Sequence, residues 1–271
     1  MINNRFIEKF NAITERNSSF LCVGLDTDYE KIPQHLKKKN RPKSIFKFNK
    51  IIVDATKDLV CCYKLNSAFY EAEGSDGIKI LKETVKYIGG NVPIIIDAKR
   101  GDIGNSSKMY CRFVFEYLDA DAVTVMPYMG YDSMKPFIDY TERFVFPVVL
   151  SSNKGALDFQ YYVSKGKPLY REVIDKIKDN ENVGFVFGAT KPEDIKNIRD
   201  AGINNMLLIP GIGSQGGDLE KSVKFAFMNS SKALFNVSRS IIYSGSGKNF
   251  AYSVRSTAEK YKNMIISHIE V

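Results

Sequence analysis

The sequence predicts an α/β fold, a (β/α)8 or TIM barrel, formed as a single domain over residues 1–271. Eight short apolar runs rich in β-branched residues recur along the chain, and segments of helical periodicity separate most of them. Alternating strands and helices favour parallel strands covered by helices. The length suits a barrel of about 250 residues, and eight repeats of one unit favour a closed barrel over an open, doubly wound sheet.

Each element is predicted from its own pattern of apolar residues. The predicted strands are Phe20–Asp26, Cys61–Asn66, Val92–Lys99, Ala122–Pro127, Phe146–Ser152, Val183–Thr190, Met206–Gly211 and Ala233–Arg239. The predicted helices are Ile45–Leu59, Gly77–Ile88, Ser107–Leu118, Pro168–Lys178, Pro192–Ala201, Leu219–Met228 and Phe250–His268. Two of these helices begin with proline, which is favoured at the first helical position.

Two long loops interrupt the alternation, near residues 27–43 and 153–167. The first contains the basic run Lys37–Arg41, which we interpret as solvated surface because blocks of like charge usually are. Aromatic residues flank this run but are not interleaved with it, as a platform for nucleic acid would require. The second loop follows the fifth strand on the side where barrel loops cover an active site, so a lid is one interpretation of it.

The charge balance favours acidic partners without selecting one. Lys and Arg number 39 against 31 Asp and Glu, a formal net charge of +8 that suits phosphorylated metabolites, nucleic acid or an anionic surface. The four cysteines form no C-x-x-C pair, and most lie in predicted strands, which is typical of reduced, buried thiols. With no secretory pattern and no apolar run near the roughly 18 residues that span a bilayer, we expect a cytoplasmic protein outside membranes.

Several chemistries are disfavoured by what the sequence lacks. Its two histidines, His35 and His268, make a Ser-His-Asp triad or a histidine-rich metal site implausible. The first strand is not followed by a dinucleotide-binding glycine pattern, and "SGSGKNF" at Ser244–Phe250 lacks the register of a Walker loop. The positive charge is scattered and no nucleic-acid-binding motif is present, so we expect no nucleic-acid partner.

Polar side chains stand where the predicted strands end, the edge of a barrel that carries its active site. The residues selected by this rule are Asp26, Lys64, Asp97, Lys99, Ser152, Gln215 and Arg239. Because side chains alternate along a strand, Asp97 and Lys99 should point to one side and Arg100 to the other, towards helices. Lys64 ends the neighbouring strand, which would place Asp97 between two lysines within hydrogen-bonding distance.

An alternating array of this kind lowers the pKa of its carboxylate and keeps both ammonium groups charged. The alternative is a salt-bridge network that only plugs the mouth of the barrel. Buried ion networks are weak stabilisers, so stability alone is a poor reason for such a cluster. The sequence therefore favours a metal-free site built on lysine and aspartate.

A phosphate-binding site is predicted from the last two strand ends. "PGIGSQGGD" at Pro210–Asp218 places four glycines after the seventh strand, and "NVSRS" at Asn236–Ser240 places Arg239 at the end of the eighth. Many barrels bind phosphate with these two loops, through backbone N–H groups and a nearby helix N-terminus. An ordinary flexible turn is the alternative, and the neighbouring arginine argues against it.

Taken together, these motifs resemble the orotidine 5′-phosphate decarboxylase family, and the match covers most of the chain. The matching segments, in the family's order, are "GLD" at Gly24–Asp26, "YKLN" with Lys64, "DAKRGDIGNS" with Asp97, Lys99 and Asp102, "SSNKG" at Ser151–Gly155, "PGIGSQGGD" with Gln215, and "SRSI" with Arg239. The long loops resemble the longer-chain branch of the family. Lys154, where many relatives have Pro, and Ser238, where Gly is common, depart from the pattern.

The resemblance implies decarboxylation of orotidine 5′-phosphate to UMP by a homodimer without metal or cofactor. It assigns Lys99, Asp97, Lys64 and Asp102 to catalysis, and Asp26, Ser106, Ser152, Gln215 and Arg239 to substrate binding. Lys99 would stabilise and protonate the carbanion at C6, and Asp102 would complete the array in the partner subunit. A sugar-phosphate decarboxylase or aldolase of the same superfamily, using Mg²⁺, is one alternative. A basic nucleic-acid-binding protein is the alternative from another class.

Overall fold

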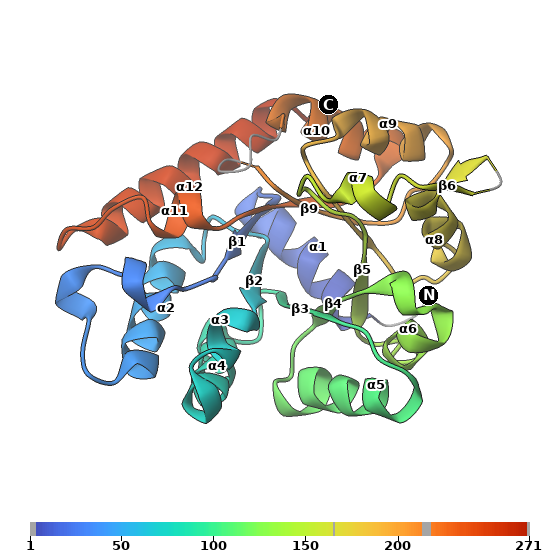
Figure 1. The fold of residues 1–271 in the computed structure, drawn as a ribbon. Coiled ribbons are helices and arrows are strands. Elements are labelled where there is room, and N and C mark those ends of the chain that lie inside the picture. Colours follow the sequence, from blue (N-terminus) through green and yellow to red (C-terminus); the bar gives the residue numbers. More distant parts are fainter. Residues whose placement is uncertain (1–3, 165, 213–217, 270–271) are drawn as a thin grey trace.

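The computed structural model describes residues 4–164, 166–212 and 218–269. Eight parallel strands close into a barrel in the order β1, β2, β3, β4, β5, β8, β9, β10 and back to β1 (Figure 1). The strands are β1 (Leu21–Gly24), β2 (Cys62–Asn66), β3 (Ile94–Arg100), β4 (Ala122–Val125), β5 (Phe144–Leu150), β8 (Phe185–Phe187), β9 (Leu207–Pro210) and β10 (Ala233–Val237). Each overlaps one predicted run, and the (β/α)8 prediction is confirmed.

Helices surround the barrel, and the last of them packs against the first helix of the ring, α12 against α2 (Figure 1). The α-helices are α1 (Arg5–Asn17), α2 (Arg41–Thr56), α3 (Ala68–Glu71), α4 (Gly74–Ile88), α5 (Gly104–Cys111), α6 (Tyr131–Ile138), α7 (Ala156–Phe159), α8 (Leu169–Ile177), α9 (Pro192–Asp200), α10 (Leu219–Ala226), α11 (Arg239–Ile242) and α12 (Phe250–Ser267). A π-helical segment, Arg112–Tyr117, extends α5. None of the helices in the described ranges is long and apolar enough to cross a membrane.

Helix α1 was not predicted, although the spacing of its apolar residues indicates a helix. Phe6, Phe10 and Ile13 recur at helical intervals and are all buried, while five charged residues lie among the other positions. The ring of Phe6 packs 5.1 Å from that of Phe144, at the start of β5. Asn4 accepts a hydrogen bond from the backbone N–H of Ile7 and so caps the helix. The helix therefore covers the amino-terminal end of the barrel.

The two predicted long loops contain short elements. Residues 27–43 include the 3-10 turns Tyr29–Lys31 and Gln34–Leu36, and α2 begins at Arg41, four residues before the prediction, because Asn40 caps it. Residues 153–167 include α7 and one strand of the hairpin formed by β6 (Val163–Ser164) and β7 (Lys167–Pro168). Elements this short form because of tertiary packing and local turns, and the periodicity of apolar residues does not predict them.

One further helix was missed, and several helices begin at other residues than predicted. Helix α6 was not predicted, because it has only eight residues and Pro136 interrupts its pattern. Helix α5 begins at Gly104 rather than Ser107. Pro168 is the N-cap of α8, in an extended conformation, whereas Pro192 does open α9 as predicted. Proline suits both positions, so its presence locates the start of a helix to within about a residue or two.

Candidate active site

A cavity of about 310 Å³ opens at the carboxyl ends of the barrel strands. Six predicted site residues line it: Asp26, Lys64, Asp97, Lys99, Ser152 and Arg239. It is also lined by the polar residues Asn66, Thr124, Ser151, Asn153, Asn236, Ser238 and Ser240, and by Val148, Val186, Leu208, Pro210, Gly211 and Ile212. One wall of the cavity is thus charged, and apolar side chains from β5, β8 and β9 face the same space.

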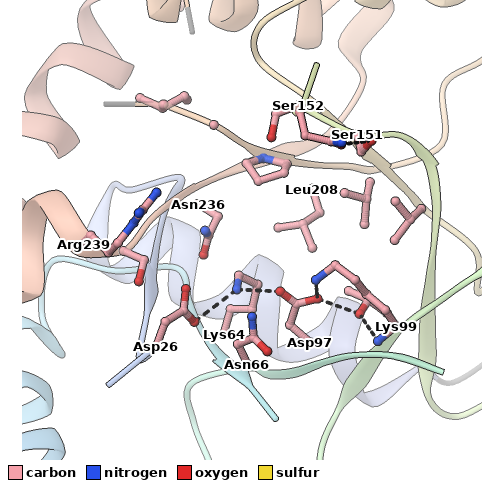
Figure 2. Close-up of a pocket in the computed structure, with 18 of the residues that line it drawn as sticks. Asp26, Lys64, Asn66, Asp97, Lys99, Ser151, Ser152, Leu208, Asn236 and Arg239 are labelled. Atoms are coloured by element: carbon pink, nitrogen blue, oxygen red, sulfur yellow. Dashed lines mark hydrogen bonds and ion pairs between the residues drawn. The ribbon is translucent and has the colours of Figure 1, made fainter. Parts of the chain in front are cut away.

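The charged wall is a row of four side chains (Figure 2). Lys64 Nζ lies 2.9 Å from Asp97 Oδ2 and 3.5 Å from Asp26 Oδ1. Lys99 Nζ lies 2.6 Å from Asp97 Oδ1. Asp97 therefore bridges two ammonium groups, and the predicted alternating array is present within one chain.

Burial and charge act in opposite directions on this array. Burial raises the pKa of Asp97, but the charges and hydrogen bonds of Lys64 and Lys99 outweigh it and hold that pKa well below its usual range. Burial lowers the pKa of Lys64, and the carboxylates of Asp26 and Asp97 outweigh it and raise that pKa above its usual range. At neutral pH the central pair is fully ionised, as the sequence predicted.

Lys99 is the exposed end of the array. Its side chain is 44% exposed, whereas that of Lys64 is 5% exposed. The Lys99 ammonium therefore faces the cavity while remaining paired with Asp97. An ammonium in this position can reach a bound molecule. Lys64 also lines the cavity, but it is more buried and lies between the carboxylates of Asp26 and Asp97.

The orientation of Lys99 arises from an irregular strand rather than from regular alternation. In the pairing of β3 with β4, Ile96 is level with Val123 and Arg100 with Val125, so the three residues Asp97–Lys99 stand opposite Thr124 alone. Lys99 has a φ of 48°, the left-handed region that costs a non-glycine residue about 1 kcal/mol. Asp97 and Lys99 do share a side, but the alternation from which we predicted this breaks down here.

Arg100 points away from the array, as predicted. It forms an ion pair with Glu71 of α3, and its guanidinium lies 4.9 Å from the ring centroid of Tyr110 in α5. These contacts are with the helices on either side of β3. Arg100 therefore links β3 to its two neighbouring helices and does not line the cavity.

Asp26 is held at the opposite end of the array by the segment that follows β1. The hydroxyl of Tyr243 donates to the carbonyl of Asp26 and accepts from the N–H of Asp28, at 3.2 and 2.7 Å. The hydroxyl of Tyr70 donates to the carbonyl of Leu25 at 3.0 Å. Tyr70 lies in α3 and Tyr243 is the C-cap of α11, so the turn that carries Asp26 is fixed by elements beyond the strand ends.

Arg239 is the first residue of α11 and lies at the Asp26 end of the row, away from Lys99 (Figure 2). Ser238, one of the two departures from the family pattern, donates from Oγ to the carbonyl of Gly24 at 2.9 Å. A Cβ on Gly24 would lie 2.7 Å from Cβ of Ser238, so the glycine permits the close approach of these two strand ends. The serine is therefore accommodated by a contact with β1.

Ser151 and Ser152 form another edge of the cavity, after β5 (Figure 2). The side-chain oxygen of Gln160 accepts from the N–H of Ser151 at 2.8 Å, and its amide donates to the Ser151 hydroxyl at 2.9 Å. Gln160 is the C-cap of α7. The loop after β5 thus folds back on the strand end from which it leaves and holds Ser151 at the cavity.

Two predicted site residues in the described ranges, Asp102 and Ser106, do not line the cavity. Asp102 accepts a hydrogen bond from the N–H of Ile103 at 2.7 Å and has no contact with the array. Ser106 is exposed on α5 and does not line the cavity. Gln215 lies outside the described residues. The first two are near each other in sequence, so one segment carries both of them away from the chain's own site.

Sequence reasoning missed several polar residues of the cavity, and three of them, Asn66, Thr124 and Asn236, belong to barrel strands. Thr124 is the most consequential, because it hydrogen-bonds both Asp97 and the backbone of Lys99. All three lie at or near the carboxyl ends of predicted strands, and the same positional rule would have selected them.

The described residues contain no group of three or more His, Cys, Asp or Glu side chains placed to hold a metal ion. The fold and the cavity together define a class of protein: a barrel enzyme whose reactive groups are side chains at the carboxyl ends of its strands. Known proteins specify that class further.

The model of the orotidine 5′-phosphate decarboxylase / HUMPS family matches residues 19–252, and the chain belongs to this family. A relative from Christiangramia forsetii, named orotidine 5′-phosphate decarboxylase, is 46% identical over 94% of this chain and 95% of its own. One of the same name from Bacteroides fragilis is 45% identical, with equal coverage. The structure of Leishmania donovani OMP decarboxylase matches with a TM-score of 0.84 at 31% identity, covering 97% of this chain and 98% of that one.

Proposed function

We propose that this chain decarboxylates orotidine 5′-phosphate to UMP, with Lys99 as the group that protonates C6. The observation that carries the proposal is the row of Lys64, Asp97 and Lys99, whose last member faces the cavity while the other two are buried. The chain's membership of the decarboxylase family supports the substrate. Arg239, at the far end of the row, supports a substrate with an anionic group remote from the reacting carbon.

The reaction breaks the bond between C6 and the carboxylate carbon, and CO2 leaves without the bonding electrons. The pair stays on C6 as a carbanion that the ring hardly delocalises. The Lys99 ammonium stabilises this charge electrostatically and then donates a proton from Nζ to C6, and water restores the proton to Lys99. Because Asp97 and Lys64 hold the ammonium in place beforehand, little reorganisation is needed when the carbanion forms.

Asp97 has a second role in this proposal. It holds Lys99 by a 2.6 Å ion pair, and its own charge would lie near the departing carboxylate. Repulsion between the two carboxylates would raise the energy of the bound substrate, and loss of CO2 would relieve that repulsion. The ionised state of Asp97, maintained by the two lysines, is required for both effects.

The remaining predicted residues are proposed to bind the nucleotide. Asp26 would bind ribose hydroxyls, Ser152 the pyrimidine, and Arg239 together with Gln215 the 5′-phosphate. The cavity geometry supports this order, since Asp26 and Arg239 lie at one end and Ser152 at another edge (Figure 2). Binding energy from the phosphate would orient the base at Lys99 without contacting the reacting carbon.

We propose a homodimer in which Asp102 completes the array of the partner subunit. Neither Asp102 nor Ser106 lines the cavity of its own chain, and both lie on the segment that runs from the end of β3 through α5. The exposed apolar side chains Ile103 and Met109 lie on the same segment, 60% and 46% exposed. An assembly that covers this surface would bring the acidic residue and the serine to a second cavity, where Ser106 would bind a ribose hydroxyl.

A cytoplasmic location and the absence of a nucleic-acid partner remain predictions. The reduced, cytoplasmic setting is supported by four cysteines that are all free and buried.

The activity is tested by following the loss of orotidine 5′-phosphate absorbance in the presence of EDTA. We expect full turnover with the chelator, because the proposed chemistry uses only side chains. A reaction that stops with EDTA and returns with Mg²⁺ would favour the alternative sugar-phosphate decarboxylase or aldolase chemistry. No turnover under either condition would contradict the proposed substrate.

The shared site is tested by mixing two inactive homodimers, Asp102→Ala and Lys99→Ala, under conditions of reversible dissociation. Random re-pairing makes about half the dimers hybrids, and each hybrid has one site with both residues intact, so activity should return to roughly a quarter of wild type. Mass-tagged chains establish that subunits exchange. Exchange without recovered activity would place Asp102 in the site of its own subunit.

A further inference from the structure

Thr124, at the end of β4, is buried against the array, with 1% of its surface exposed. Its hydroxyl donates to Asp97 Oδ1 at 2.8 Å, the same oxygen that pairs with Lys99 Nζ. The same hydroxyl accepts from the backbone N–H of Lys99 at 3.0 Å. One oxygen atom therefore contacts the carboxylate of the array and the backbone of the lysine that faces the cavity.

These two bonds lie where the pairing of β3 with β4 is interrupted. Thr124 is the single β4 residue opposite Asp97–Lys99, and its side chain accepts the N–H that a regular ladder would pair with a backbone carbonyl. Among the described non-glycine residues with positive φ, Lys99 alone lies in a strand. Residues in that region persist when their surroundings fix them, and such residues gather at functional sites.

We propose that Thr124 is a positioning residue for the reaction: its hydroxyl fixes the left-handed backbone of Lys99 and the rotamer of Asp97, and so aims the Lys99 ammonium at the substrate. The donor bond orients Asp97 Oδ1 towards Lys99, while the acceptor bond holds the backbone from which the lysine side chain leaves. Thr124 need not touch the reacting atoms to act in this way. The proposal rests on the role of Lys99 given above.

Removal of the hydroxyl has a specific consequence. Without it, the N–H of Lys99 loses its acceptor and the buried carboxylate of Asp97 loses a donor to Oδ1. The Lys99 backbone can then leave its strained conformation, and the ammonium moves away from C6. Arg239 lies at the other end of the row, beside Asp26 and away from Lys99 (Figure 2), so we expect it to keep its position.

The test compares Thr124→Val, which keeps the shape and removes the hydroxyl, with Thr124→Ser, which keeps the hydroxyl. For Thr124→Val we expect kcat to fall by about 10- to 100-fold, from the loss of a hydrogen bond to a charged group, with the Kd for UMP changed by less than about threefold. For Thr124→Ser we expect kcat within about threefold of wild type. Turnover is followed by absorbance and UMP binding by calorimetry.

Thr84→Val is the matched control, because Thr84 is also 1% exposed and hydrogen-bonded, but it lies in α4 and does not line the cavity. It should lose stability without losing kcat. If Thr124→Val does not fold, Thr124→Ala removes the same hydroxyl without placing a methyl group against Asp97.

Three results would overturn the proposal: an unchanged kcat in the hydroxyl-free variant, a serine variant no better than the valine variant, or UMP affinity that falls as far as kcat. A Lys99→Ala variant that remains active would instead refute the role of Lys99, which distinguishes the two failures.

Discussion

Two aspartates at opposite ends of the barrel each pair with two cationic side chains, but their surroundings are very different. Asp97, near the carboxyl end of β3, bridges Lys64 at 2.9 Å and Lys99 at 2.6 Å. Asp121, just before β4 at the amino-terminal end, bridges Arg5 at 2.7 Å and Lys9 at 2.8 Å. Each carboxylate also accepts a further hydrogen bond, from Thr124 in one case and from the N–H of Ile94 in the other.

The difference lies in what the cations face. Both partners of Asp121 come from α1, so this cluster at the amino-terminal end, the lower cluster, holds that helix against the barrel. None of its three charged residues lines the active-site cavity. In the cluster around Asp97, the upper cluster, Lys99 lines the cavity and has a strained, left-handed backbone conformation. A buried carboxylate between two cations is therefore no sign of catalysis by itself. The cavity and the strained conformation mark the functional one.

The comparison is tested most strongly by Lys99→Ala. We expect turnover to fall by at least about 10³-fold, because the electrostatic stabiliser and the proton donor are both lost. The midpoint of thermal unfolding should move by only a few degrees, and UMP should still bind. Absorbance kinetics, melting curves and calorimetry measure the three quantities. Near-normal turnover would remove Lys99 from the mechanism and make the upper cluster equivalent to the lower one.

Asp121→Asn should have the opposite profile. It leaves Arg5 and Lys9 beside a neutral amide, and we expect the free energy of unfolding to fall by about 2–4 kcal/mol, with kcat per folded molecule unchanged. Urea denaturation measures the change. Asp119→Asn is the matched control, because Asp119 also pairs with Arg5 but its side chain is 61% exposed, so it should cost less than about 1 kcal/mol. Loss of kcat in folded Asp121→Asn would show that the lower cluster affects the site.

The smallest of these effects concerns the far end of the upper row. Arg239→Ala should weaken UMP binding by about 10- to 100-fold, the value of charged hydrogen bonds to a phosphate, and leave uridine binding nearly unchanged. Calorimetry with both ligands measures the difference. Equal losses for the two ligands would mean that Arg239 does not contact the phosphate.

The elements that the sequence predicted well are those whose pattern is local. The apolar run Val92–Ile96 and the charges that follow it predicted β3 and its functional end, because a buried strand and its solvent edge differ sharply in composition. Helix α6 was missed because Pro136 lies within it, and α1 because its charged residues obscured three well-spaced apolar positions. In both cases tertiary packing outweighs a weak local signal.

The sequence by itself determined the barrel, the order of its strand ends and which charged residues stand on them, because strand periodicity and the carboxyl-edge rule are properties of the chain's own pattern. Only the tertiary structure decided how those residues meet. The bulge in β3, the positive φ of Lys99 and the two bonds of Thr124 depend on a neighbouring strand 25 residues away along the chain. Such a contact joins segments whose separation no local periodicity encodes, so it exists only once the barrel closes.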